Sequence, residues 1–162
     1  GMIFDGRIAE DFKLNTGTWV SVGVLKGKLI AAGNGLIQDA VITGRDTAYL
    51  GAIIFPELNY CRNLTTLPES ATIKEIVKHP KVVEKLQTVL DTLGQSSTGS
   101  STCIKKAIFA DFELSLDNGE ITDKGSINQR AILRHRAAIA AMLYQKDTPL
   151  NVLEYRRVKV KK

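Results

Sequence analysis

The sequence predicts an α+β fold in which a small mixed or antiparallel sheet is covered by helices on one side. Three observations support this fold class. β-rich runs and helical patterns follow one another in the order strands, helix, hairpin, helices, strand, helix. Two of the β-rich runs are close enough along the chain to pair as a hairpin. The length of 162 residues suffices for one domain with its own core.

The first expected elements are short strands. Phe12 and Leu14 alternate with polar neighbours, which is typical of a half-buried strand. A turn signal at Asn15–Gly17 leads into the β-rich run Thr18–Val22. Within that run we expect Trp19 to pack in the sheet rather than to contact a ligand.

A helix is expected next, with Ser21 as its N-cap and an end near Ala32. Gly33–Gly35 ends this helix, because glycine accepts the left-handed backbone conformation common at helix C-termini. The apolar residues on one face of the helix are Val22, Leu25, Leu29 and Ala32.

The middle of the chain predicts a hairpin followed by helices. Leu36–Ile42 and Tyr49–Phe55 form its two strands, and Pro56 ends the second strand. Pro80 suits the first turn of the longest helix that follows. The expected helices cover residues 57–63, 71–78 and 80–93, and the apolar stripe of the last one consists of Val82, Leu86, Val89 and Leu93.

Residues 95–102 are rich in serine and threonine and precede a predicted strand over residues 104–110. A loop of this composition can bind phosphate through backbone amides. This one lacks the Gly-Lys-Ser/Thr ending of a P-loop and leads into a strand instead of a helix. We therefore interpret residues 95–102 as a surface loop.

The last helix is expected over residues 127–145, after a turn at 117–119. Ser126 and Gln129 have the spacing of a capping box that opens it. We expect His135 to be packed and hydrogen-bonded near the apolar stripe. The arginines expected on the solvated side are Arg130, Arg134 and Arg136, and the expected core face consists of Ala131, Ile132, Ala138, Ile139, Met142 and Leu143.

Composition and charge exclude several classes of protein. Hydrophobic residues make up 44% and charged residues 24% of the chain, as in soluble globular proteins. No apolar run approaches the ~20 residues of a membrane-spanning helix. The net charge is +5, and residues 156–162 carry five positive charges. This tail has no interleaved aromatic residues for base stacking, so we interpret it as solvated and expect neither a nucleic acid nor a membrane as partner.

Cysteine and histidine are too scarce for a metal site or a disulfide framework. Cys61 and Cys103 lie far apart without CxxC spacing, and His79 and His135 are the only histidines. We therefore expect no metal bound by the chain and a reducing, cytoplasmic location. No GxSxG motif marks a serine nucleophile.

Two segments together carry a family resemblance. The hinge-like motif DGRIAEDFKLNTG spans residues 5–17, and the motif GEITDKGSINQR spans residues 119–130. In this order, they resemble the hinge motif and the last, lysine-bearing motif of the adenylate-forming superfamily. The amino-acid sequence of the two motifs is most similar to the C-terminal part of feruloyl-CoA synthetases, and the resemblance covers about residues 3–145.

The resemblance implies that residues 1–162 are a single C-terminal domain with a basic tail over 151–162. The superfamily's large N-terminal domain, which binds ATP and the carboxylate, is absent from these residues. The resemblance implies that this N-terminal domain is the partner of the chain. Family members join an aromatic or other carboxylate to CoA with ATP and Mg²⁺. No ligand is expected to bind tightly to this domain alone, which should be inactive.

The resemblance also implies roles for individual residues. Lys124 is the catalytic lysine that the last motif offers, although the commoner form of the motif has lysine at the position of Ser126. Either the loop shifts to bring Lys124 to the same point, or this subfamily uses it differently. A cation there would stabilise the negative charge that develops on the α-phosphate.

The hinge motif implies three further sites. Arg7 matches the arginine that contacts the nucleotide, because its guanidinium suits ribose and phosphate oxygens. The acidic hinge residue is either Glu10 or Asp11. The choice stays open because the segment between Gly6 and Gly17 is one residue longer here than in the family's motif. Gly17 is expected in the turn that faces the CoA channel, where a small residue allows close approach.

Two other functions stay open at this point. The chain could belong to an adenylation domain that passes its acyl group to a carrier protein. It could also be a free-standing basic module that binds nucleic acid through its tail. The identity of the carboxylic acid cannot be read from the sequence, because the pocket that binds it is absent.

Overall fold

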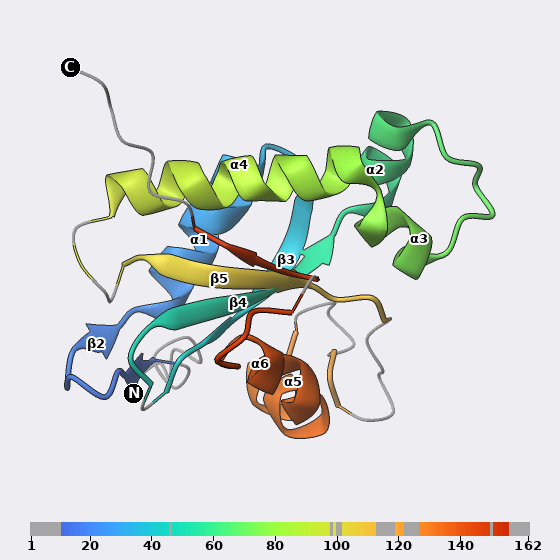
Figure 1. Cartoon of the computed structure of the whole chain (residues 1–162). Coiled ribbons are helices and arrows are strands. Elements are labelled where there is room, and N and C mark those ends of the chain that lie inside the picture. Colours follow the sequence, from blue (N-terminus) through green and yellow to red (C-terminus); the bar gives the residue numbers. More distant parts are fainter. Residues whose placement is uncertain are drawn as a thin grey trace, which may run out of the picture.

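A four-stranded mixed sheet organises the computed structural model of the chain (Figure 1). The structure describes residues 11–45, 47–97, 99, 102–112, 119–121, 127–149 and 151–155. The predicted α+β fold is confirmed. The elements in chain order are β1 (Phe12–Lys13), β2 (Trp19–Val20), α1 (Val22–Gly33), β3 (Ile37–Thr43), β4 (Leu50–Pro56), α2 (Leu58–Thr65), α3 (Ile73–Lys78), α4 (Pro80–Ser96), β5 (Ile104–Phe109), α5 (Gln129–His135), α6 (Ala137–Met142) and β6 (Val152–Glu154).

The strands of the sheet lie in the order β3-β4-β5-β6. β3 and β4 form the predicted antiparallel hairpin, with Thr43 opposite Gly51 and Ile37 opposite Pro56. β5 runs parallel to β4, and the helices α2, α3 and α4 connect the two strands. Parallel neighbours require such a crossover connection, which a tight turn cannot supply.

The prediction of a basic tail over residues 151–162 is wrong at its start. Val152–Glu154 form strand β6, which pairs antiparallel with β5. Residues 156–162 lie outside the described part of the chain. A three-residue strand has too little pattern of its own to be recognised; the open edge of β5 supplies its hydrogen-bond partners.

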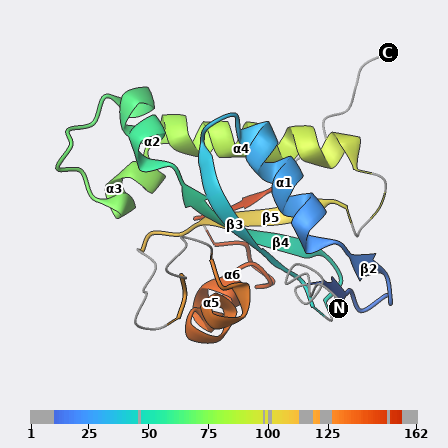
Figure 2. The same ribbon diagram turned by 180° about the vertical axis from the view of Figure 1, so that it is seen from behind.

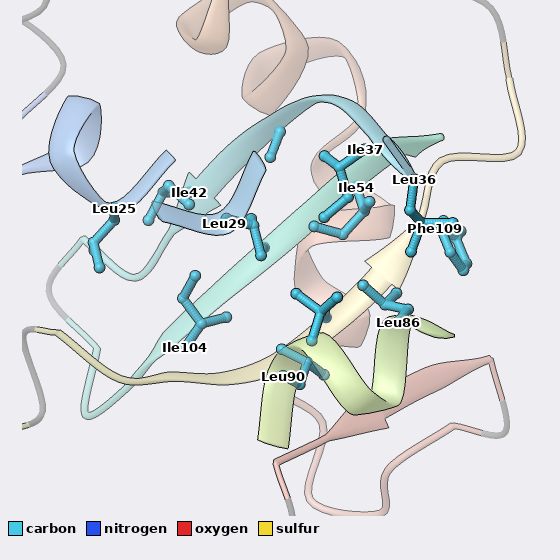
Figure 3. Close-up of a cluster of buried hydrophobic side chains, with 14 of the residues drawn as sticks. Leu25, Leu29, Leu36, Ile37, Ile42, Ile54, Leu86, Leu90, Ile104 and Phe109 are labelled. Carbon is cyan, nitrogen blue, oxygen red and sulfur yellow. The ribbon is translucent and has the colours of Figure 1, made fainter. Parts of the chain in front are cut away.

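One face of the sheet carries the larger hydrophobic core. Helices α1 and α4 lie across this face (Figures 1 and 2). Figure 3 shows their side chains directed toward the strands. The labelled core residues are Leu25, Leu29, Leu36, Ile37, Ile42, Ile54, Leu86, Leu90, Ile104 and Phe109.

Helices α5 and α6 cover the opposite face of the sheet, so the prediction of helices on one side is wrong (Figure 1). Ile53 and Ile108 of the sheet pack there with Ile132 of α5 and with Leu143. Every residue of β4 is buried. A central strand buried on both faces needs a hydrophobic layer on each side.

The predicted single helix over residues 127–145 is two shorter helices in the structure. The break is at Arg136, whose backbone angles are φ −115° and ψ 34°. α5 begins at Gln129 with Asn128 as N-cap, and the Asn128 side chain accepts a hydrogen bond from the Ala131 amide (3.2 Å). The predicted capping box is therefore wrong at Gln129, which is the first residue of α5 and not the third. Its predicted N-cap, Ser126, lies outside the described residues.

Gln129 instead ties α5 to the sheet. Its side chain is buried, and Oε1 accepts a hydrogen bond from the amide of Ile42 (3.1 Å). Ala138 is exposed, contrary to its expected place in the core. α4 continues to Ser96, so the predicted loop over 95–102 begins two residues too early.

Two helical glycines provide a matched test of the packing. A Cβ on Gly94 of α4 would lie 2.2 Å from Cε2 of Tyr155, whereas a Cβ on Gly27 of α1 would meet nothing within 4 Å. We expect Gly94→Ala to lower the free energy of unfolding by about 1–3 kcal/mol, because the Tyr155 ring must move. Gly27→Ala should raise it by about 0.5–1 kcal/mol through helix propensity alone. Urea unfolding measures both, and equal effects would contradict the packing of Tyr155 on α4.

Candidate functional site

The β1–β2 hairpin presents an open turn. Leu14 donates its amide to the carbonyl of Thr18 (3.0 Å), and Gly17 donates to the carbonyl of Leu14 (2.9 Å). Gly17 has φ +85°, a conformation that L residues rarely adopt. A Cβ at Gly17 would meet nothing within 4 Å, so the turn has free space around it. This geometry suits close approach of another molecule to the backbone.

Asp11 connects the beginning of the described chain to helix α1. Its Oδ1 accepts a hydrogen bond from the amide of Val22 (2.9 Å). Ser21 makes no side-chain capping bond, so the predicted role of Ser21 as cap is wrong. The carboxylate of Asp11 satisfies a free amide of the first helical turn, where a negative charge is also favoured by the helix dipole.

Trp19 lies on the outer side of the hairpin. Its side chain is 62% exposed, whereas the next residue, Val20, is buried. The Lys13 ammonium lies 5.1 Å from the centre of the Trp19 ring. The expectation that Trp19 packs in the sheet is therefore wrong, because β1 and β2 form a separate two-stranded ribbon.

The ends of the segment that carries Lys124 are held together. Ile121 and Ile127 form an antiparallel bridge. Beside the bridge, the amide of Asn128 donates to the carbonyl of Glu120 (2.8 Å). Lys124 itself lies outside the described residues, as do the sequence-predicted site residues Arg7 and Glu10.

Glu120 and Arg136 form an ion pair that the sequence analysis missed. Glu120 is fully buried, and its two carboxylate oxygens accept hydrogen bonds from Nε (3.0 Å) and Nη2 (3.3 Å) of Arg136. The Arg136 guanidinium also lies 4.0 Å from the centre of the Phe112 ring. The expectation that Arg136 lies on the solvated side is therefore wrong for its guanidinium, which contacts a buried carboxylate. No pattern in the sequence signals this pair, since Glu120 follows a polar turn.

His135 is exposed, so the prediction of a packed histidine is wrong. Its Nδ1 lies 3.9 Å from Oε2 of Glu120. The contact is an ion pair only when the imidazole is protonated. Arg136, by contrast, carries a permanent positive charge and makes two hydrogen bonds to the Glu120 carboxylate.

The hairpin turn and the Ile121–Ile127 bridge lie at opposite ends of the sheet. At one end, Asn15 donates its amide to the carbonyl of Thr47 in the β3–β4 connection (2.9 Å). At the other end, Ile121 and Ile127 line a hollow of about 530 Å³ with Pro56, the last residue of β4. Strands of seven residues separate the two ends by roughly 20 Å.

A larger groove of about 680 Å³ lies beside the hairpin end. It is formed by β1, the β3–β4 connection and helices α5 and α6. Its lining includes the apolar residues Phe12, Leu133 and Ala140 and the charged residue Arg45. Residues from the start of the described chain and from the two helices after the Lys124 segment therefore line one groove.

Cys61 does not have the features of an activated nucleophile. Burial, with a smaller effect from the Glu57 carboxylate, raises the pKa of the Cys61 thiol to about 11. Cys61 is therefore a protonated core residue at neutral pH, and Cys103 is also a free thiol. Burial likewise raises the pKa of Tyr144, whose hydroxyl lies 2.8 Å from Oγ1 of Thr43.

The described residues contain no group of three or more histidine, cysteine, aspartate or glutamate side chains placed to hold a metal ion. Helices with the length and apolar character needed to cross a membrane are also not found in the described part of the chain.

Solved structures with a similar fold are adenylation domains. The A domain of carboxylic acid reductase from Segniliparus rugosus, solved with AMP and a co-purified carboxylic acid, has a TM-score of 0.61 at 16% identity over 85% of this chain. The A-PCP didomain of the same kind of enzyme, solved with AMP, has a TM-score of 0.60 at 16% identity over 84%. The adenylation domain of a carboxylate reductase from Mycobacterium chelonae has a TM-score of 0.58 at 18% identity over 85%.

The chain spans only 17–20% of the length of these structures. No protein-family model matches the chain, and no curated protein matches it. The likeness therefore shows the fold.

Proposed function

We propose that the chain is the mobile C-terminal domain of an adenylate-forming enzyme, and that this enzyme is an aryl-acid–CoA ligase of the feruloyl-CoA synthetase kind. One observation carries the proposal. The Gly17 turn lies at the end of the sheet that carries the β3–β4 connection, whereas the Ile121–Ile127 bridge lies beside Pro56 at the other end of the seven-residue strands. A single active site on a partner domain can face only one of them at a time. Two reaction steps would then require two orientations of the domain.

In the first step, a carboxylate oxygen attacks the α-phosphate of ATP, and pyrophosphate leaves with the electrons of the broken bond. Lys124 would stabilise the charge that develops on the phosphate oxygens, and Arg7 would bind the nucleotide. The bridge between Ile121 and Ile127 supports this role, because it pairs the two described residues that flank the Lys124 segment.

In the second step, a CoA thiol attacks the acyl carbon of the adenylate, AMP leaves, and the thiol proton passes to solvent or a base. The turn at Gly17 would then face the active site in place of the Lys124 segment. Its positive φ and the free space around it support close approach of the pantetheine chain.

ATP, CoA and Mg²⁺ are assigned to the whole enzyme. The described residues present cations and an open turn, but no cluster of acidic side chains for a divalent ion. We therefore assign Mg²⁺ and the carboxylate pocket to the missing N-terminal domain. The two free thiols are consistent with the proposed cytoplasmic location.

Transfer to a carrier protein is a second candidate for the thiol step. The similarity to the fold of an A-PCP didomain favours it. Nothing among the described residues favours binding of nucleic acid or membrane, and we propose neither as partner.

Pyrophosphate release tests the proposal. The chain joined to its N-terminal domain should release pyrophosphate from ATP with ferulate or a related aryl carboxylate, and should then form the CoA thioester. The 162-residue chain alone should fold but release none, because the family resemblance assigns the adenine and carboxylate pockets to the N-terminal domain. Pyrophosphate release by the pure chain, or failure of the joined protein with every aryl acid tried, would overturn the proposal. Acyl transfer to a PCP but not to CoA would favour the second candidate.

A further inference from the structure

We infer that Glu120 and Arg136 are positioning residues for the segment that carries Lys124, an inference that rests on the proposed function. The fully buried carboxylate of Glu120 accepts two hydrogen bonds from the guanidinium of Arg136. We assign neither residue a contact with the reacting atoms. Their effect on the chemistry passes through the residues between Ile121 and Ile127.

Burial makes the pair mutually dependent. A carboxylate with no solvent exposure needs a compensating positive charge, and two-point contact with a guanidinium fixes its orientation as well. Removing Arg136 takes the two-point contact away from the Glu120 carboxylate, and removing Glu120 takes it away from the guanidinium. The contact can therefore hold the backbone at Glu120 in one position.

The backbone of Glu120 transmits this position to both ends of the segment. Its carbonyl accepts the amide hydrogen of Asn128 (2.8 Å), next to the bridge between Ile121 and Ile127. The entering and the leaving strand of the segment are thus both connected to one buried carboxylate. Asn128 is in turn the N-cap of α5.

The backbone of Arg136 is hydrogen-bonded to both neighbouring helices. It lies at the break between α5 and α6, where its amide donates to the carbonyl of Ile132 (2.7 Å) and its carbonyl accepts the amide of Ala140 (3.2 Å). The guanidinium stacks over Phe112, which packs edge-on against Phe55 of β4, with ring centres 5.9 Å apart. The pair therefore connects the Lys124 segment to the central sheet.

Hydrogen exchange on the 162-residue chain tests the positioning directly. In Glu120→Gln and in Arg136→Met, the amide of Asn128 should exchange at least about tenfold faster than in the wild type. Arg134→Met is the matched control, because Arg134 is an exposed arginine of α5, two residues before Arg136; it should change the rate less than threefold. If either variant fails to fold, Arg136→Lys replaces it, since lysine keeps the charge and loses the paired hydrogen bonds.

Gly94→Ala separates positioning from general stability. This variant destabilises the domain at α4 and leaves the ion pair intact. It should leave the exchange of Asn128 within threefold of the wild type. Equal acceleration in Gly94→Ala and in the pair variants would overturn the inference, as would unchanged exchange in Glu120→Gln and Arg136→Met.

The joined enzyme provides the chemical test. Arg136→Met should lower kcat for adenylate formation at least tenfold with little change in KM, while thioester formation from preformed adenylate stays within threefold of the wild type. A parallel loss of both steps would indicate a structural role alone and overturn the inference. If the wild-type joined enzyme forms no adenylate, the proposed function fails, and the exchange experiment still decides whether the pair holds the segment.

Discussion

Lys124→Ala in the joined enzyme is expected to lower the rate of adenylate formation by at least ~10²-fold, the scale seen when one preorganised donor is removed. An interaction made only in one transition state affects that barrier alone. Preformed feruloyl-adenylate and CoA should therefore still give thioester at nearly the wild-type rate. Pyrophosphate exchange measures the first step, and thioester formation from the adenylate measures the second.

Two control variants accompany this experiment. Lys85→Ala removes an exposed lysine of α4 and should leave both steps unchanged. Ser126→Ala tests the position of the motif, since the commoner family form has its lysine there. Loss of adenylation in Ser126→Ala, with Lys124→Ala unaffected, would show that the assignment of Lys124 is wrong. If both variants retain full activity, Lys124 is an ordinary surface lysine.

Proline at the hinge is expected to impair one half-reaction at least about tenfold more than the other, because a reacting group held out of place loses most of its rate advantage. Proline fixes φ near −65° and also restricts the residue before it. The hydrogen bond from Val22 to Asp11 holds the Asp11 side chain on the domain. We therefore expect the larger effect from Glu10→Pro, and both half-reactions should be measured for each proline variant.

Asp11→Pro needs its own control because it also removes the cap of α1. Loss of an N-terminal cap costs about 1 kcal/mol of stability. Asp11→Ala removes the cap without fixing φ, so its unfolding and its two rates isolate that contribution. Wild-type rates of both half-reactions in Glu10→Pro and Asp11→Pro would show that neither residue is the hinge.

Elements set by neighbours along the chain were predicted correctly from the sequence. The hairpin of β3 and β4, the helix α4 and the end of α1 at Gly33–Gly35 all follow from periodicity and from glycine and proline positions. Asn34 adopts φ 48° at that helix end, as the Gly-Asn-Gly sequence indicates. These features depend on backbone preferences and on amphipathic patterns that a short segment contains by itself.

For the candidate site, the sequence predicted the turn at Gly17, and the structure adds the local contacts of Asp11. The turn at Gly17 and the acidic residue Asp11 fall on the exposed hairpin and its attachment to α1. The functional roles of Asp11 and Gly17 stay predictions, and so do those of Lys124, Arg7 and Glu10, which lie outside the described part of the chain. The sequence contains both motifs, whereas only the fold shows that the Gly17 turn and the Ile121–Ile127 bridge lie at different ends of the sheet.

The sequence by itself determined the α+β class, the hairpin and the helices that lie over one face of the sheet. The tertiary structure alone decided that β6 pairs with β5, that α5 and α6 cover the second face, and that the helix breaks at Arg136. It also decided that Glu120 is buried against Arg136. The physical reason is distance along the chain: a strand edge, a second hydrophobic layer and a buried counter-charge are supplied by residues far away in sequence, so no local pattern contains them.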